Sequence, residues 1–114
     1  MEQERKYWEP EIETMPSDKL RKLQVERLQE IVAYSYERTK FYRRKYEQAG
    51  VKPSDINTLD DLGKLPLVED KELRNAPMED KLAVPWEDIK YCCSSSGTTG
   101  VPEPVGLTRE DFEI

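Results

Sequence analysis

Apolar residues recur at helical spacing in the stretch that follows the first sixteen residues. Lys, Arg, Gln and Glu separate them, which is the pattern of an amphipathic helix with one face toward a core. Ser17 is a favourable N-cap residue with Pro16 just outside, so the pattern predicts a helix over about 18–37. The apolar stripe of this helix consists of Leu20, Leu23, Leu28, Ile31 and Val32.

A second, shorter helix is expected directly after the first. Thr39 can cap its N-terminus, and Gly50 stands where a left-handed residue commonly ends a helix, with Val51 as the apolar contact that follows. We expect the two helices to run antiparallel as a helical hairpin over residues 17–50, with the leucine stripe facing the tyrosines of the second helix. The apolar face of the second helix consists of Tyr42, Tyr46 and Ala49.

The segments on either side of this hairpin carry weaker patterns. Residues 1–16 are expected to form an extended lead-in whose rings, Tyr7 and Trp8, pack on the first helix. Residues 51–88 are expected to be loop-rich with short helices, because prolines and capping residues interrupt the apolar runs. Within this segment we expect a turn at 53–55, a Thr58–Asp61 capping box, extended residues at 65–67 and 82–85, a short helix at 70–73 and a turn at 86–88.

Residues 89–114 predict a strand, a loop, a second strand and the start of a helix. The strands are expected at 89–93 and 104–107, and a capping box of Thr108 with Asp111 begins a helix at Arg109. Between the strands, glycines let successive N–H groups converge and hydroxyls add further donors, which favours polyphosphate binding. The alternative is a flexible Ser/Gly linker, against which the threonines and Pro102 are comparatively stiff. The loop lacks the Gly-Lys pair of P-loop NTPases.

Composition and charge exclude several function classes. The net charge of −6 and pI near 4.8 argue against binding nucleic acid by bulk electrostatics. The chain has no histidine, which excludes Ser-His-Asp and Cys-His catalysis and histidine metal ligands. Two adjacent cysteines and no long apolar run indicate a reducing, cytoplasmic setting without a membrane span. One basic cluster is interpreted as a solvated helical face and comprises Arg38, Lys40, Arg43, Arg44 and Lys45.

At the loop the sequence resembles a known family. The stretch SSSGTTGVPEPVGLT, Ser94 to Thr108, resembles the phosphate-loop signature of the adenylate-forming acyl-CoA ligases, and more narrowly their phenylacetate–CoA ligase branch. The stretches YWEPEIETMP, LQVERLQEIVAYSYERTKFYRRKYEQAGV and INTLDDLGKLPLVEDKELR are similar to earlier segments of that branch, in the same order. The resemblance covers nearly the whole chain.

The resemblance implies an enzyme that activates a carboxylic acid with ATP and Mg²⁺. It releases pyrophosphate, holds an acyl-adenylate and passes the acyl group to the sulfur of coenzyme A. Two positions depart from the family pattern, Val101 in place of a common Lys and Glu103 in place of a small or basic residue. A carboxylate roughly 8 Å from a phosphate costs on the order of 1 kcal/mol per charge, so Glu103 is expected to weaken ATP binding unless it points away. By position, the β- and γ-phosphates would be held by Ser95, Ser96, Gly97, Thr98, Thr99 and Gly100.

The family's adenine, acid and lysine elements lie after this loop, and this chain ends at Ile114. The expected fold class is therefore an α+β fragment: a helical hairpin and short helices, then a β-hairpin carrying the phosphate loop, as a piece of a larger α/β adenylate-forming enzyme. We expect no catalytic residue or metal ligand in it, no activity alone, and no tightly bound cofactor. Two strands without a sheet also predict self-association or pairing with the missing remainder of the ligase.

Two other functions stay open. One is a related enzyme on the same scaffold that adenylylates a deazaflavin-type coenzyme rather than an acid. The other is a non-enzymatic helical interaction module that retains a relic loop. A small-molecule acid is the expected partner only for the intact ligase, and the acid pocket that would separate the two enzymes lies beyond these residues.

Overall fold

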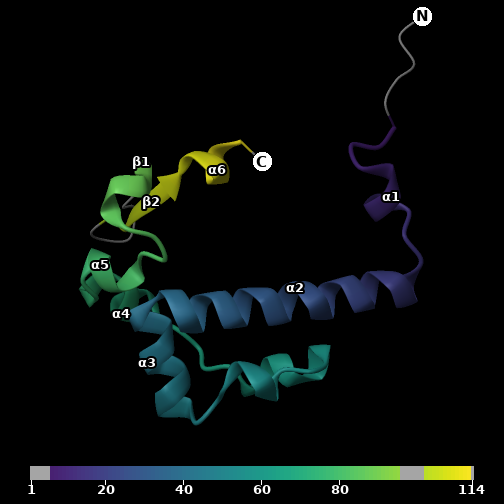
Figure 1. Cartoon of the computed structure of the whole chain (residues 1–114), viewed down its shortest axis with the longest axis horizontal. Coiled ribbons are helices and arrows are strands. Elements are labelled where there is room, and N and C mark those ends of the chain that lie inside the picture. The colour runs from purple at the N-terminus through teal and green to yellow at the C-terminus, as the bar shows by residue number, and fades with distance from the viewer. Residues whose placement is uncertain (1–5, 96–101, 114) are drawn as a thin grey trace, which may run out of the picture.

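A computed structural model of the chain describes residues 6–95 and 102–113. The shorter elements are arranged along one long helix, and most of them lie around its C-terminal half (Figure 1). None of the helices in these two ranges is both long and apolar enough to cross a bilayer. The elements are α1 (Pro10–Glu13), α2 (Ser17–Arg38), α3 (Lys40–Ala49), η1 (Pro53–Asp55), η2 (Leu59–Lys64), α4 (Asp70–Asn75), α5 (Met78–Lys81), η3 (Trp86–Asp88), β1 (Ile89–Ser94), β2 (Pro104–Thr108) and α6 (Arg109–Phe112).

The ends of the first two helices follow local chemistry. Thr39 caps α3 by accepting a hydrogen bond from the Tyr42 amide at 3.2 Å. Gly50 ends α3 with φ 69° and ψ 26°, the left-handed conformation predicted for it. The prediction for Ser17 was wrong, because α2 begins one residue earlier. The Pro16 carbonyl accepts the first helical hydrogen bond, from the Leu20 amide at 2.9 Å, which makes Pro16 the cap and Ser17 the first helical residue.

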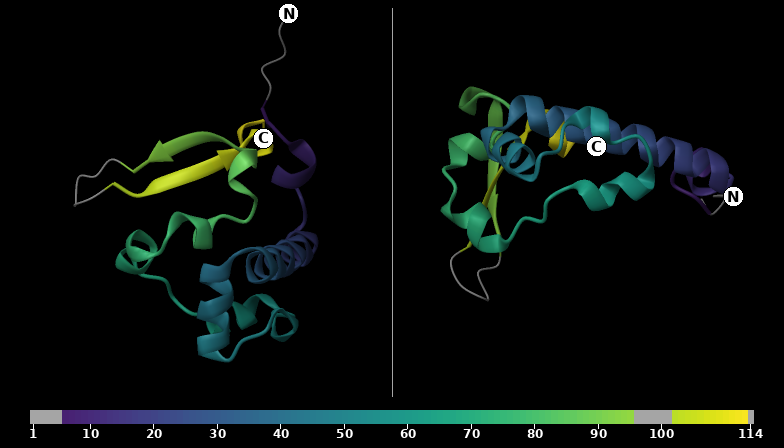
Figure 2. Two further views of the ribbon diagram at one scale, coloured as in Figure 1. Left: turned by 60° about the vertical axis from the view of Figure 1, so that its left-hand side comes forward. Right: turned by 90° about the horizontal axis from the view of Figure 1, so that it is seen from below.

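The two helices do not lie antiparallel side by side. In the views of Figures 1 and 2, α3 leaves the end of α2 at a steep angle. Only Thr39 separates them, with an extended backbone of φ −122° and ψ 130°. A reversal into two neighbouring antiparallel helices normally takes a loop of about two to five residues, so one residue produces a bend instead.

A small core fills the angle between the two helices. Val32, Tyr46, Val51 and Ile56 are buried there, and Val51 and Ile56 come from the segment that returns beneath α2. Of the predicted apolar stripe, Val32 is buried in this core and Leu28 packs against it, whereas Ile31 is 58% exposed. Partly buried residues packed against the core are Leu28, Tyr36, Tyr42 and Leu65.

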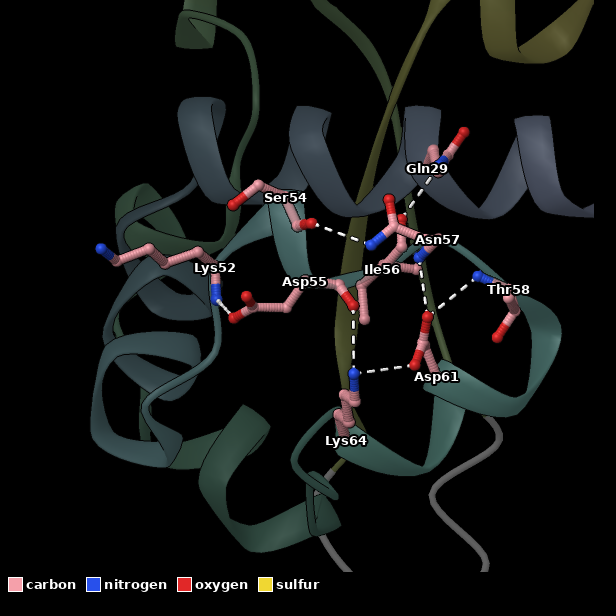
Figure 3. A network of polar contacts seen from close by, with 9 residues as sticks. All are labelled: Gln29, Lys52, Ser54, Asp55, Ile56, Asn57, Thr58, Asp61 and Lys64. Carbon is pink, nitrogen blue, oxygen red and sulfur yellow. Dashed lines mark hydrogen bonds and ion pairs between the residues drawn. The ribbon is translucent and has the colours of Figure 1, made fainter.

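Polar contacts tie the returning segment to α2 (Figure 3). The Gln29 side-chain amide donates to the Ile56 carbonyl at 2.9 Å. Asp61 accepts from the backbone amides of Asn57 at 2.8 Å and Thr58 at 2.9 Å, which confirms the predicted pairing of Thr58 with Asp61. The Lys64 ammonium lies 2.8 Å from the Asp61 carboxylate. The segment between α3 and α4 is thus ordered by its own short-range bonds as well as by the core.

The lead-in differs from its prediction. Residues Pro10–Glu13 form α1, whose first turn is stabilised by the Glu13 carboxylate accepting the amides of Trp8 at 2.8 Å and Glu9 at 2.7 Å. The Trp8 side chain is 75% exposed, so the expected packing of this ring on the first long helix was wrong. Local capping, rather than burial of the ring, sets the conformation here.

The C-terminal part is a β-hairpin followed by one helical turn, as predicted. β1 pairs antiparallel with β2, with Tyr91 opposite Leu107 and Cys93 opposite Val105. In the part of the chain that the structure describes, these two strands form the whole sheet (Figure 2). Thr108 caps α6 reciprocally with Asp111. Like α1, the short helix α5 was not predicted; it begins after Pro77, which has the non-helical backbone of an N-cap.

Candidate functional site

The predicted phosphate loop connects β1 to β2. Ser95 is the one predicted phosphate-contacting residue within the described ranges, and it directly follows the last residue of β1. The site can therefore be built from the chain on both sides of the loop, Ser95 on one and Glu103 on the other. The predicted residues that lie outside the described ranges are Ser96, Gly97, Thr98, Thr99 and Gly100.

Ser95 and Glu103 are joined by two hydrogen bonds. The Ser95 amide donates to the Glu103 carbonyl at 2.9 Å, and the Glu103 amide donates to the Ser95 hydroxyl oxygen at 2.7 Å. They extend the strand pairing by one step beyond Ser94 and Pro104. A serine hydroxyl that accepts one bond still has its own proton to donate. Ser95 is thus fixed in place and retains a donor for an anion.

The Glu103 carboxylate has a cationic partner. The Lys81 ammonium, at the end of α5, lies 3.2 Å from the Glu103 Oε1 and donates to the Leu73 carbonyl at 2.7 Å. This neutralising contact changes the expectation for Glu103, because a paired carboxylate repels a nearby phosphate less than a bare one.

The pKa of Tyr42 is raised mainly by burial, then by the neighbouring Tyr46, and then by the negative charge of Glu103.

A close contact holds the hairpin against the segment that precedes it. A Cβ atom added at Gly106 would lie 3.1 Å from the Leu82 Cδ2 and 3.3 Å from the Ile89 Cγ2. Side chains larger than glycine would therefore push the strand away from Leu82. The absence of a side chain at position 106 lets β2 approach the chain that follows α5.

Three residues of the basic cluster, Arg43, Arg44 and Lys45, lie on α3 and contact other parts of the protein. Arg43 donates to the carbonyls of Tyr36 at 2.9 Å and Glu37 at 3.0 Å, which satisfies the C-terminal end of α2. Lys45 lies 2.9 Å from Glu72, and this ion pair, followed by the Glu69 amide, lowers the pKa of the Glu72 carboxyl.

Sequence reasoning missed Lys81. It lies outside the loop, and its contact with Glu103 spans 22 positions. No spacing rule links two residues so far apart, and only the packing of α5 beneath the hairpin brings them together. The two cysteines, Cys92 and Cys93, are free and exposed in β1.

Comparison with known proteins gives consistent matches over nearly the whole chain, although no family model matches it. The phenylacetate-coenzyme A ligase of Thermus thermophilus is 45% identical over 107 residues, which is 94% of this chain and 24% of that enzyme. The phenylacetate-coenzyme A ligase of Escherichia coli is 42% identical over 102 residues, 90% of this chain and 23% of that enzyme.

Solved structures of 2-hydroxyisobutyryl-CoA ligase share the fold. One, in the postadenylation state with 2-HIB-AMP, has a TM-score of 0.83 at 36% identity and covers 93% of this chain and 23% of that one. Another, with 2-HIB-AMP and CoA in the thioesterification state, has the same TM-score at 38% identity. The chain spans about a quarter of the length of these relatives. By sequence and by fold, the chain is similar over nearly its whole length to one segment of the phenylacetate-coenzyme A ligases and of 2-hydroxyisobutyryl-CoA ligase.

Proposed function

We propose that this chain is the phosphate-loop segment of an AMP-forming acid–CoA ligase. The intact enzyme would convert ATP, a carboxylic acid and coenzyme A into an acyl-CoA, AMP and pyrophosphate through an acyl-adenylate. The observation that carries the proposal is the 45% identity to a phenylacetate-coenzyme A ligase over 94% of the chain. A match of that extent includes the Ser94–Gly100 loop, because at most a few residues at the ends are left out.

In this proposal the loop binds the β- and γ-phosphates of ATP. Backbone N–H groups and the hydroxyls of Ser95, Ser96, Thr98 and Thr99 would act as neutral donors to a departing pyrophosphate and would stabilise the charge that develops on it. The ion pair of Lys81 with Glu103 supports this role because it offsets the negative charge next to the loop. No group of three metal-ligating side chains that could hold a metal ion occurs among residues 6–95 and 102–113.

The chain by itself is proposed to be catalytically inactive. It spans about a quarter of its relatives' length, and the loop supplies phosphate contacts but no adenine site, acid pocket or thioester chemistry. The cytoplasm is the proposed location. Pyrophosphate release by the pure chain in the presence of ATP, above that of a Ser95→Ala/Thr98→Ala variant, would contradict this part of the proposal.

A chimeric enzyme tests the function of the segment. This chain would replace the matching segment of the Thermus thermophilus phenylacetate-coenzyme A ligase, and phenylacetate-dependent ATP–pyrophosphate exchange would be measured. We expect the chimera to be active. Thr98→Ala should lower exchange by roughly ten- to a hundredfold, because one hydrogen bond to a charged acceptor contributes about 1.5–3 kcal/mol.

A matched threonine controls for general damage to the chimera. Thr58 is exposed and caps η2, away in sequence from the loop; Thr58→Ala should cost about 1 kcal/mol of stability but leave the exchange within about twofold of the unmodified chimera. An active chimera that tolerates Thr98→Ala as well as Thr58→Ala would show that the loop does not bind the phosphates, whereas the family relationship would be unaffected.

A further inference from the structure

The two ends of the phosphate loop are held together by a contact that needs both backbone and side chain. The Ser95 amide donates to the Glu103 carbonyl at 2.9 Å, and the Ser95 hydroxyl oxygen accepts from the Glu103 amide at 2.7 Å. The position of Glu103 therefore determines the position of Ser95. Any group that holds the Glu103 side chain also holds the first residue of the loop.

Lys81 is that group. Its ammonium lies 3.2 Å from the Glu103 Oε1, and it also donates to the carbonyl of Leu73 in α4 at 2.7 Å. The Leu73 carbonyl belongs to the last part of α4 (Asp70–Asn75), where carbonyls lack helical partners. Lys81 thus bridges the end of α4 and the hairpin, two parts of the chain that the sequence places far apart.

The burial of this ion pair makes it more than a surface contact. The Lys81 side chain is 11% exposed and that of Glu103 is 21% exposed. Exposed ion pairs contribute little to structure, but a partly buried charge that loses its partner is strongly unfavourable. Either residue alone would have to turn toward water, and the Glu103 backbone would then no longer be held against Ser95.

We propose that Lys81 and Glu103 are positioning residues for the phosphate loop. Together with Ser95 they form a unit, here called the loop-base clamp, that fixes the two strand ends from which the loop departs. The clamp also neutralises the Glu103 carboxylate. In the intact enzyme the clamp would hold the Ser95 donors in position for a phosphate before ATP binds. This role rests on the function proposed above.

The test uses the 114-residue chain itself. Amide hydrogen exchange would be measured by NMR at Ser95 and Glu103 in the wild type and in Lys81→Met, Lys81→Arg and Glu103→Gln. We expect Lys81→Met and Glu103→Gln to accelerate exchange at both amides by about tenfold, and Lys81→Arg to restore most of the protection because it keeps the charge and the donors.

Internal controls separate the clamp from general destabilisation. The amides of Val51 and Ile56, which bond to the Tyr46 and Pro53 carbonyls, should exchange at unchanged rates in every variant. Lys45→Met removes another ion pair to α4, in which Lys45 is 19% and Glu72 40% exposed and the charged atoms lie 2.9 Å apart, and should leave the Ser95 and Glu103 amides unaffected.

A double variant tests whether Lys81 acts through Glu103. Because the two residues share one interaction, Lys81→Met/Glu103→Gln should loosen the Ser95 amide no more than the worse single variant. Additive acceleration, or unchanged exchange at Ser95 and Glu103 in both single variants, would overturn the clamp. If Lys81→Met fails to fold, the near-isosteric Glu103→Gln decides the question alone.

Inorganic pyrophosphate serves as the probe for the functional part. It would be titrated into each variant and followed through the Ser95 and Glu103 amide shifts. We expect Lys81→Met to weaken pyrophosphate binding about fivefold, and the loss to be smaller in the double variant, where no unpaired carboxylate remains. Accelerated exchange at the clamp in the variants, together with no pyrophosphate response in the wild type, would support the clamp and count against phosphate binding by this loop.

Discussion

Asp61 is a residue whose ionisation is strongly influenced by its surroundings. The Lys64 ammonium at 2.8 Å, and then the amides of Asn57 at 2.8 Å and Thr58 at 2.9 Å, stabilise its carboxylate and hold its pKa well below the usual range. Every one of these donors favours the charged form. The folded state therefore releases the Asp61 proton more readily than the unfolded chain does.

This difference predicts how stability depends on pH. Since the pKa of Asp61 is lower in the folded state, its contribution to the free energy of unfolding is present above about pH 4. This contribution is lost as the pH falls through the pKa of the folded state. We expect Asp61→Asn to lower the Tm at pH 6, and the gap in Tm between the variant and the wild type to narrow as the pH falls from 5 to 2. Thermal unfolding followed by circular dichroism measures this, with Asp60→Asn at the exposed neighbouring position as the control. A gap that stays constant with pH would contradict the role of the charge.

Gly50 is constrained by its backbone rather than by space. Its φ of 69° is disfavoured for residues with a side chain, and nothing lies within 4 Å of an added Cβ. Gly50→Ala should therefore lower the free energy of unfolding by about 1 kcal/mol. Gly63→Ala is the matched control, because Gly63 also has open space but no positive φ. Equal effects of the two substitutions in urea denaturation would show that strain at Gly50 is unimportant.

At the scale of elements, the joint between α2 and α3 depends on Thr39. Its side chain is buried, accepts from the Tyr42 amide at 3.2 Å and donates to the Ser35 carbonyl at 2.7 Å. One hydroxyl thus closes the C-terminus of one helix and the N-terminus of the next. The bend that forms the core pocket for Val32 and Tyr46 follows from this single residue.

Removing that hydroxyl should weaken both helix ends. Thr39→Ala is expected to lower the free energy of unfolding by about 1 kcal/mol, the usual cost of losing an N-cap, and by somewhat more if the Ser35 bond also contributes. Urea denaturation followed by tyrosine and tryptophan fluorescence measures it. Thr39→Ser keeps the hydroxyl and should recover most of the loss; a loss as large as that of alanine would assign the effect to the methyl group instead.

The molecule as a whole is open rather than compact. Its radius of gyration is 17.5 Å, whereas a compact domain of this length has about 13 Å. Its accessible surface is 9463 Å², against roughly 6,500 Å² for a compact monomer of its mass. Large apolar side chains contribute to this surface, and those at least half exposed are Trp8, Ile31, Leu62, Leu67, Trp86 and Phe112.

This surface predicts self-association of the isolated chain. The hairpin is the expected contact, because β1 and β2 form a two-stranded sheet in the described residues and carry Tyr91 and Val105 at 44% and 46% exposure. Sedimentation velocity should show dimers or larger species as concentration rises. Val105→Lys should shift the distribution toward monomer, whereas Ile31→Lys on α2 should change it less. A monomer at all concentrations would refute the prediction.

The sequence by itself determined the features that depend on a few neighbouring residues. The cap at Thr39, the left-handed end at Gly50 and the reciprocal bonds of Thr108 with Asp111 all appear where they were predicted. Both strands of the hairpin also follow from local pattern. The site was predicted only as a stretch of loop, of which Ser95 lies in the described residues. Such features are short-range, because caps and turns satisfy backbone groups within three or four residues.

Only the tertiary structure decided how these elements meet. The exposure of Ile31 and Trp8 depends on which surfaces face one another, and α3 bends away from α2 because one residue cannot reverse the chain. The ion pair of Lys81 with Glu103 joins residues 22 positions apart. Periodicity records which face of an element is apolar but not what packs against it, so contacts between distant residues require the fold itself.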